Sequence, residues 1–245
     1  MTETEVAITP ELLERVLREV TSDAVLVGGQ ALAIWVEYYD IEVTAPVLVG
    51  AISDDADFIG SRADLAAIAK AVSAIPEYVS PRVISALVGQ VKIRVAPSEF
   101  VNIDVLHKLV GLDAADVRRR ASAATLGTTD FFVMHPLDVL CSRVENLANL
   151  VEKQGPQGIE QTRLAILVAR AAIEEMVVES EEGQRTALNA LEYVVRIGKS
   201  GAGRKVTKEF GIDFRGGVPS YAIKSEAFHK NRWPQILLEL DPLRD

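Results

Sequence analysis

The chain has almost none of the cysteine on which disulfide scaffolds and thiolate metal sites depend. Its single cysteine, Cys141, cannot form an intramolecular disulfide or supply a thiolate cluster for zinc. No histidine stands near Cys141 at a recognised spacing, so we expect a small apolar residue on a helix rather than a nucleophile. A reducing compartment suits such a sequence, and we expect a cytoplasmic protein.

Long apolar runs are also missing. The longest uncharged stretch near the middle, residues 43–52, is too short to cross a bilayer as a helix. The first six residues are acidic and polar, whereas an export signal needs a basic start and an apolar core. We therefore expect neither a membrane span nor export. Apolar residues still make up 49% of the chain, which is enough for a packed core.

Positive charge is scarce overall but concentrated late in the chain. The net charge of -9 argues against indiscriminate binding to nucleic acid and gives no support for a DNA partner. Residues 185–232 nevertheless contain ten Lys and Arg against four Asp and Glu. This basic segment can face RNA, a triphosphate or the acidic first part of the same molecule. A solvated surface explains it equally well.

The apolar periodicity predicts an α/β fold in the first part of the chain. Helical spacing is expected over residues 10–20, 30–39 and 62–74. Strands are expected over residues 24–27, 56–59, 78–86, 90–96, 100–106 and 131–134, with a further strand or hairpin arm over 43–52.

The second part of the chain is predicted to be helical. The expected helices cover residues 137–152, 159–178, 182–197, 220–228 and 234–240. The glycine-rich segment 198–205 lacks the spacing of a phosphate loop, so we expect a basic linker there. The predicted fold is thus an α/β domain with a mixed sheet and flanking helices over residues 1–135, followed by a helical domain over 136–245.

Three aspartates form the candidate reactive centre. Asp55 and Asp57 are two positions apart on a predicted strand, so their side chains point the same way. Asp104 lies on the polar face of another predicted strand. Neighbouring carboxylates repel, and a hard divalent ion such as magnesium resolves that repulsion while leaving positions for phosphate oxygens.

A glycine pair, Gly28-Gly29, stands between a predicted strand and a predicted helix. Glycines at such a turn let backbone N–H groups approach phosphate, and the start of the helix favours negative charge. Alone, such a pair is more often a tight turn without a ligand. When the three aspartates follow it in the chain, the glycine pair is a more specific signal of a phosphate-binding site.

These motifs resemble those of the polymerase-β-like nucleotidyltransferases, and most of all those of bacterial proteins related to abortive-infection toxins and toxin–antitoxin systems. The stretches that support the resemblance are Val25-Leu-Val-Gly-Gly-Gln-Ala-Leu32, Asp55-Ala-Asp-Phe58, Asp104 and His135-Pro-Leu-Asp-Val-Leu140. The resemblance implies a nucleotidyltransferase-type sheet and a magnesium-dependent enzyme that uses two Mg²⁺ ions, with Mn²⁺ as a substitute. It implies a nucleoside triphosphate donor, such as ATP, and an acceptor such as a tRNA end, a partner protein or a small molecule.

Four further residues are candidate contacts for the triphosphate: two depart from the family pattern, and two also fit a solvated strand face. Gln30 stands where the family has Ser or Thr, and Arg143 where it commonly has Lys. Residues 42–50 read as an insertion before Asp55. Lys92 shares the polar face of its strand with Arg94, which suits either phosphate contact or a solvated face.

The leading hypothesis is transfer of a nucleoside monophosphate to an acceptor hydroxyl. Asp55, Asp57 and Asp104 would bind metal, and Gly28, Gly29, Gln30, Lys92 and Arg143 would hold the nucleotide. The alternative is a catalytically inert binding partner or antitoxin-like module that keeps the fold. A helical scaffold with an inert α/β part is a third reading.

Overall fold

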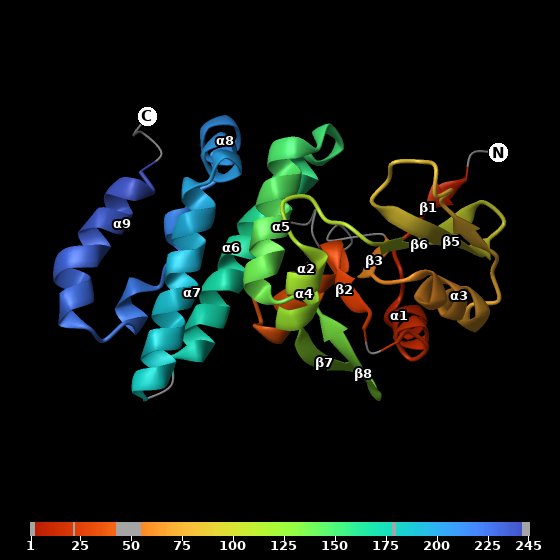
Figure 1. The fold of residues 1–245 in the computed structure, drawn as a ribbon, viewed down its shortest axis with the longest axis horizontal. Coiled ribbons are helices and arrows are strands. Elements are labelled where there is room, and N and C mark those ends of the chain that lie inside the picture. Colours follow the sequence, from red (N-terminus) through yellow and green to blue (C-terminus); the bar gives the residue numbers. More distant parts are fainter. Residues whose placement is uncertain (1–2, 22, 43–54, 178–179, 242–245) are drawn as a thin grey trace. The chain divides into compact units, whose positions relative to one another are not determined.

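The computed structural model describes residues 3–21, 23–42, 55–177 and 180–241. The contacts divide the chain into two units (Figure 1). Unit 1 comprises Met1–Ile34 and Glu42–His135, and unit 2 comprises Trp35–Ile41 and Pro136–Asp245. In these described ranges, every helix falls short of the length and apolarity that a membrane span needs. The arm predicted over residues 43–52 lies outside the described residues.

Unit 1 is built on an open mixed sheet. Its eight strands, counted over the described residues, follow the order β4-β5-β6-β3-β2-β8-β7, with β1 beside β6. The pairs β1–β6, β2–β8 and β3–β6 are parallel, and the other pairs are antiparallel. The strands are β1 Thr4–Glu5, β2 Val25–Val27, β3 Ala56–Ile59, β4 Pro76–Tyr78, β5 Leu87–Ala96, β6 Glu99–Leu106, β7 Ser122–Leu126 and β8 Thr129–Val133.

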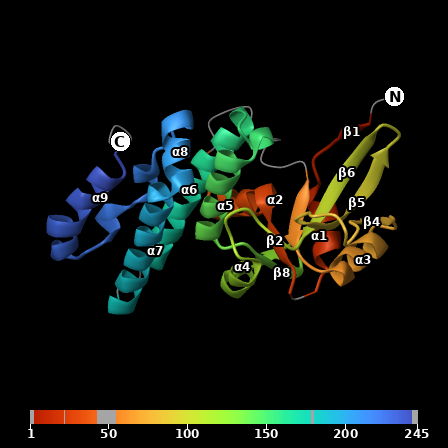
Figure 2. The same ribbon diagram turned by 45° about the horizontal axis from the view of Figure 1, so that its top comes forward.

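Two helices cover one face of this sheet. Thr9 caps α1 (Pro10–Leu17) by accepting a hydrogen bond from the backbone N–H of Leu12, and Pro10 opens the helix. Helix α3 (Arg62–Ala71) contacts α1 and the strands β4, β5 and β6 (Figure 2). A short helix, α4 (Ala114–Arg120), links β6 to the β7–β8 hairpin.

The central strands have one apolar and one polar face. The side chains on the apolar face are fully buried: Ala56, Phe58, Val91, Ile103 and Val105. The residues that alternate with them are polar and only half-buried or exposed: Asp55, Asp57, Gln90, Lys92, Asn102 and Asp104. Because side chains alternate along a strand, the helices α1 and α3 stabilise the apolar face and the polar residues lie on the opposite one.

Asp64 joins the start of α3 to the segment before β2. Its carboxylate is 2% exposed and accepts hydrogen bonds from the backbone N–H groups and the hydroxyls of Thr21 and Ser61, at 2.7–3.0 Å. Ser61 in turn accepts from the Asp64 N–H, which completes a capping box. One side chain therefore fixes both the helix start and a connection far away in sequence.

We expect Asp64→Asn to lower the free energy of unfolding by about 1–3 kcal/mol at pH 7, because a buried acceptor of several hydrogen bonds is lost. Urea denaturation measures this difference. The matched control is Asp116→Asn, which changes a half-buried aspartate of α4 that pairs with Arg119 and Arg120 and should shift the free energy by less than about 1 kcal/mol. Equal effects of the two substitutions would contradict the role given to Asp64.

The same comparison should depend on pH. Burial would raise the pKa of Asp64, but the hydrogen bonds donated by Thr21 and Ser61 outweigh it and hold the pKa below its usual value. The carboxylate then stabilises the fold fully above its unfolded-state pKa of about 3.9, and this contribution is lost as the pH falls through the folded-state pKa. The difference in the free energy of unfolding between wild type and Asp64→Asn should therefore become smaller below about pH 4.

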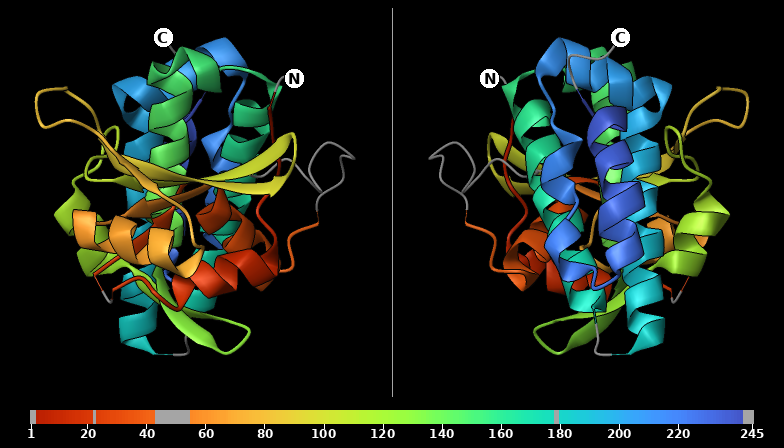
Figure 3. Two further views of the ribbon diagram at one scale, coloured as in Figure 1. Left: turned by 90° about the vertical axis from the view of Figure 1, so that its right-hand side faces the viewer. Right: turned by 90° about the vertical axis from the view of Figure 1, so that its left-hand side faces the viewer.

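Unit 2 is a helical assembly that follows β8. Its helices lie side by side, and Figure 3 shows α7 alongside α9. The chain segment Trp35–Ile41, which includes the end of α2 (Gly28–Tyr38), belongs to it. Its main helices are α5 Pro136–Asn149, α6 Pro156–Met176, α7 Glu181–Lys199, α8 Gly201–Phe210 and α9 Trp233–Glu239.

Some sequence predictions of elements were wrong. The strand expected over residues 78–86 is mostly a loop, because β4 ends at Tyr78 and turns precede β5. Strand β7 was not predicted, since its sequence Ser-Ala-Ala-Thr-Leu has little apolar alternation. The segment 198–205 is not a linker: α7 continues to Lys199, and α8 begins at Gly201 with Ser200 as its N-cap. The segment predicted as a helix over 220–228 forms a short 3₁₀ turn and the start of a π-helix.

Candidate functional site

The site lies on the polar face of the sheet, where β3 runs between β2 and β6. In the antiparallel pair β2–β3, Asp57 stands opposite Val27, the last residue of β2. In the parallel pair β3–β6, Asp57 stands opposite Asp104. Neighbouring strands lie about 4.8 Å apart and paired residues share a face, so the two aspartates are adjacent on the sheet.

Gly28 brings the start of α2 onto the Asp57 carboxylate. It follows β2 directly and adopts φ +71°, a left-handed conformation that favours glycine. A Cβ atom at this position would lie 2.1 Å from Asp57 Oδ2 and 3.0 Å from its Cγ. Only a residue without a side chain permits this approach, so the glycine turn and the carboxylate form one local structure.

Asp104 is oriented by its own strand. The Asn102 amide donates a hydrogen bond of 2.8 Å to Asp104 Oδ1, because residues two apart on β6 share a face. On the other side, Gln90 of β5 stands opposite Asp104 and donates to Glu77 of β4. The sequence prediction did not include Asn102 or Gln90. The period of two along the strands would have identified Asn102.

Asp55 stands directly before β3, two positions from Asp57, and is half-buried. Among the described residues, however, no group of three Asp, Glu, His or Cys side chains is placed so that it could hold a metal ion. The register thus brings Asp57 and Asp104 together, while the three carboxylates do not form a ready-made metal cage. Two carboxylates beside a helix start fit a hard cation that keeps several water ligands.

Gly29 and Gln30 are the second and third residues of α2. Gly29 is buried and Gln30 is half-buried. The first turn of a helix has backbone N–H groups without partners inside the helix, and its dipole favours nearby negative charge. No acidic residue occupies the first turn of α2. The Asp57 carboxylate of β3 lies against Gly28, the first residue of this turn.

Lys92 and Arg94 extend the polar face away from the aspartates. Both cations form ion pairs with the Glu3 carboxylate, just before β1. The Lys92 ammonium also lies 3.8 Å from the ring centroid of Phe100. The hydrogen bond from Lys92 and its positive charge, followed by those of Arg94, hold the pKa of Glu3 below its usual value. The sequence had no signal for this partner of Lys92.

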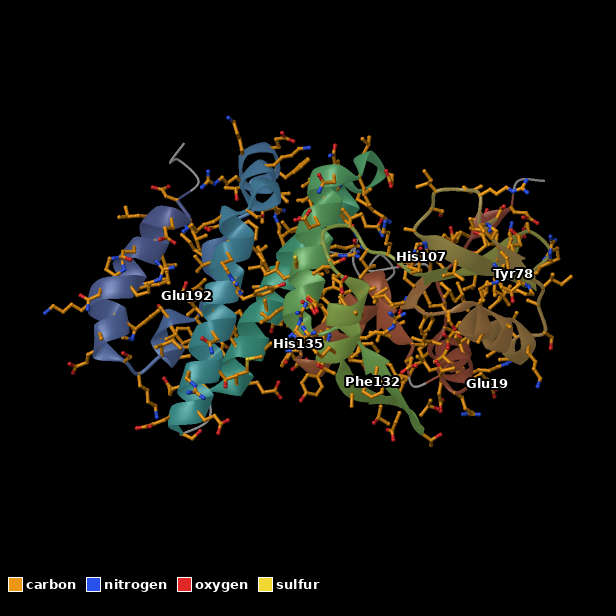
Figure 4. The ribbon with its side chains drawn as sticks, in the orientation of Figure 1. Glu19, Tyr78, His107, Phe132, His135 and Glu192 are labelled. Atoms are coloured by element: carbon orange, nitrogen blue, oxygen red, sulfur yellow. The ribbon has the colours of Figure 1, made fainter. Side chains whose placement is uncertain are left out.

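Arg143 lies in unit 2, on α5. Its side chain is 7% exposed, and its Nη1 donates a 3.2 Å hydrogen bond to Gln161 of α6. Its predicted contact with a triphosphate stays a prediction. His107, directly after β6, has its Nε2 2.8 Å from the Ser85 carbonyl oxygen (Figure 4).

Comparison with known proteins finds no matching family model and no significant match among curated proteins.

The close approach of Gly28 to Asp57 can be tested with two alanine substitutions. Gly28 and Gly211 have similar left-handed φ angles, +71° and +65°, but a Cβ at Gly211 would meet no atom within 4 Å. We expect Gly211→Ala to lower the free energy of unfolding by about 1–2 kcal/mol through backbone strain alone. Gly28→Ala should cost at least about 1 kcal/mol more, because its Cβ displaces the carboxylate. Equal losses in thermal or urea unfolding would refute this account of Gly28.

Proposed function

We propose that the chain is a magnesium-dependent nucleotidyltransferase. The observation that supports this most is the pairing of Asp57 with Asp104 on one sheet face, with Gly28 against the Asp57 carboxylate at the start of α2. Phosphoryl-transfer sites need clustered oxygen ligands for divalent ions beside donors for phosphate. This arrangement places both kinds of group around Asp57 on one face of the sheet. Nucleoside triphosphates and magnesium are abundant in the cytoplasm, where we expect the protein to be.

In this proposal, Asp55 and Asp57 bind magnesium, and Asp104 completes the ligand set beside the acceptor hydroxyl. When bound, magnesium supplies neutralisation of the developing charge on the phosphates. Two Mg²⁺ ions suit such a ligand set, and Mn²⁺ is the alternative. Asn102 keeps Asp104 in position through its hydrogen bond. The fold then corresponds to the nucleotidyltransferase type of mixed sheet.

The glycine turn has the complementary role of holding the triphosphate. The backbone N–H groups of Gly28 and Gly29 at the first turn of α2 donate to phosphate oxygens, and the amide of Gln30 adds a side-chain donor. Lys92 and Arg143 remain the candidate cations. The acceptor oxygen forms a bond to the α-phosphorus, pyrophosphate leaves with the electrons of the broken P–O bond, and the hydroxyl proton passes to solvent.

The test is transfer of radiolabel from α-labelled nucleoside triphosphates to acceptors in RNA, protein and small-molecule fractions of a cell lysate. We expect magnesium-dependent labelling. Asp57→Asn and Asp104→Asn should each reduce it at least about 100-fold, because loss of a metal ligand removes several kcal/mol of transition-state stabilisation.

Asp116→Asn is the control, since it also removes one aspartate from unit 1 but lies on α4 and should keep wild-type activity. The unfolding midpoint of each variant shows whether the fold is retained. Labelling that is absent for wild type, or that persists unchanged in both folded aspartate variants, would reject nucleotidyl transfer.

A catalytically inert, antitoxin-like binding module is the second candidate. The lack of a three-residue metal group among the described residues favours it, as does Gln30 in place of a hydroxyl residue. Calorimetric titration with a nucleoside triphosphate separates the two functions. The enzyme should bind more tightly with magnesium, whereas the module should bind equally with and without the ion.

The ion pair between Lys92 and Glu3 gives a further prediction for this site. If Lys92 contacts the triphosphate, Glu3→Gln should tighten nucleotide binding by about 2–10-fold, because it releases the ammonium from a weak, exposed ion pair that competes with the phosphates. Lys92→Gln should weaken binding in the Glu3→Gln background. The control is Arg94→Gln, which lies about 7 Å farther along β5 and should weaken binding less. Unchanged affinity in Glu3→Gln would remove Lys92 from the nucleotide site.

A further inference from the structure

Unit 2 contains a cavity of about 470 Å³ at one end of its helices. We call it the α8 pocket. Figure 1 shows α8 and the C-terminal end of α9 at the same end of this unit. The wall of the pocket includes Arg204, Thr207 and Lys208, which are spaced three and four residues apart and so share one face of α8. Its size is that of a site for a small molecule.

The floor of the pocket is apolar and depends on a glycine. Phe214 is 2% exposed and Leu240 is 7% exposed, and both line the cavity beside Gly198 of α7. A Cβ at Gly198 would lie 2.7 Å from Leu240 Cδ2 and 3.0 Å from Phe214 Cγ. The missing side chain lets both residues pack closely on α7, and it shapes the end of the pocket.

Among the residues that the structure describes, two of the cations that line the pocket form no ion pair, whereas its carboxylate Glu239 does. The Glu239 carboxylate forms ion pairs with Lys199 at 2.9 Å and with Arg232 at 3.0 Å. The pKa of Arg215 is raised mainly by its hydrogen bond to Asp213, and the negative charge of Asp241 contributes to the same shift. Arg204 and Lys208 are both exposed, and neither forms an ion pair with a carboxylate in the described part of the chain. Two cations and a threonine hydroxyl on one helix face are thus available to an anion.

We propose that the α8 pocket binds a small phosphate monoester that has an apolar or aromatic ring, such as a nucleoside monophosphate. The Arg204 guanidinium and the Lys208 ammonium bind the phosphate, and Thr207 donates a hydrogen bond to it. The ring packs over Phe214 and Leu240. This site is separate from the polar face of the sheet in unit 1 and does not require the proposed transferase activity.

The test is calorimetric titration of the full chain carrying Asp57→Asn and Asp104→Asn, without divalent ions. This background removes the two paired carboxylates of unit 1, so a failure of the proposed function does not affect the result. The probes are adenosine monophosphate, adenosine and inorganic phosphate. We expect the monophosphate to bind at least about tenfold more tightly than either of the others, since only it uses both parts of the pocket.

Arg204→Gln with Lys208→Gln should weaken binding of the monophosphate at least about tenfold. The matched control is Arg185→Gln with Lys230→Gln, which removes the same two charges from exposed positions of unit 2 outside the pocket and should leave affinity within twofold. Circular dichroism confirms that each variant folds. No binding of the monophosphate, equal binding of adenosine, or equal loss in the control variant would overturn the proposal.

Discussion

The register of β3 between β2 and β6 is the constraint on which the candidate site depends. It sets Asp57 beside Val27 on one strand and beside Asp104 on the other. A slip of one residue would turn the aspartates toward α1 and α3 and expose Phe58. Burial of Ala56, Phe58, Ile103 and Val105 on the opposite face therefore fixes where the carboxylates point. The apolar core and the polar site are two results of the same alternation.

The sequence predicted the central elements because their signals are local. Strand β3 was predicted with the bounds Ala56–Ile59 that the structure has, and the helix predicted from residue 10 begins at Pro10. Elements that depend on distant partners were missed. Strand β7 forms because it pairs with β8 along five residues. Helix α8 was missed because its glycines suggested a linker. In the structure, a Cβ at Gly203 would lie 2.1 Å from the Ile197 carbonyl oxygen, so this glycine permits close packing of α8 on the end of α7.

The candidate site was predictable to the extent that it follows from strand periodicity. The shared face of Asp55 and Asp57, and the polar side of Asp104, follow from a period of two. The strand order that makes β3 and β6 neighbours does not follow, because β4 and β5 come between them in sequence. The contact between Gly28 and Asp57 depends on the pairing of β2 with β3 and on a left-handed φ. The ion pair of Glu3 with Lys92 joins residues 89 positions apart, and no local pattern indicates it.

The basic segment of residues 185–232 shows how internal pairing changes the meaning of charge. Several of its cations form ion pairs within unit 2: Arg232 with Glu192 and Glu239, Arg215 with Asp213, and Lys199 with Glu239. Lys205 donates to the Ala148 carbonyl oxygen. The positive charge counted in the sequence is therefore not one continuous surface for a polyanion. What remains around α8 is a pair of neighbouring cations over an apolar floor, and such a pair matches one phosphate group better than it matches an extended strand of nucleic acid.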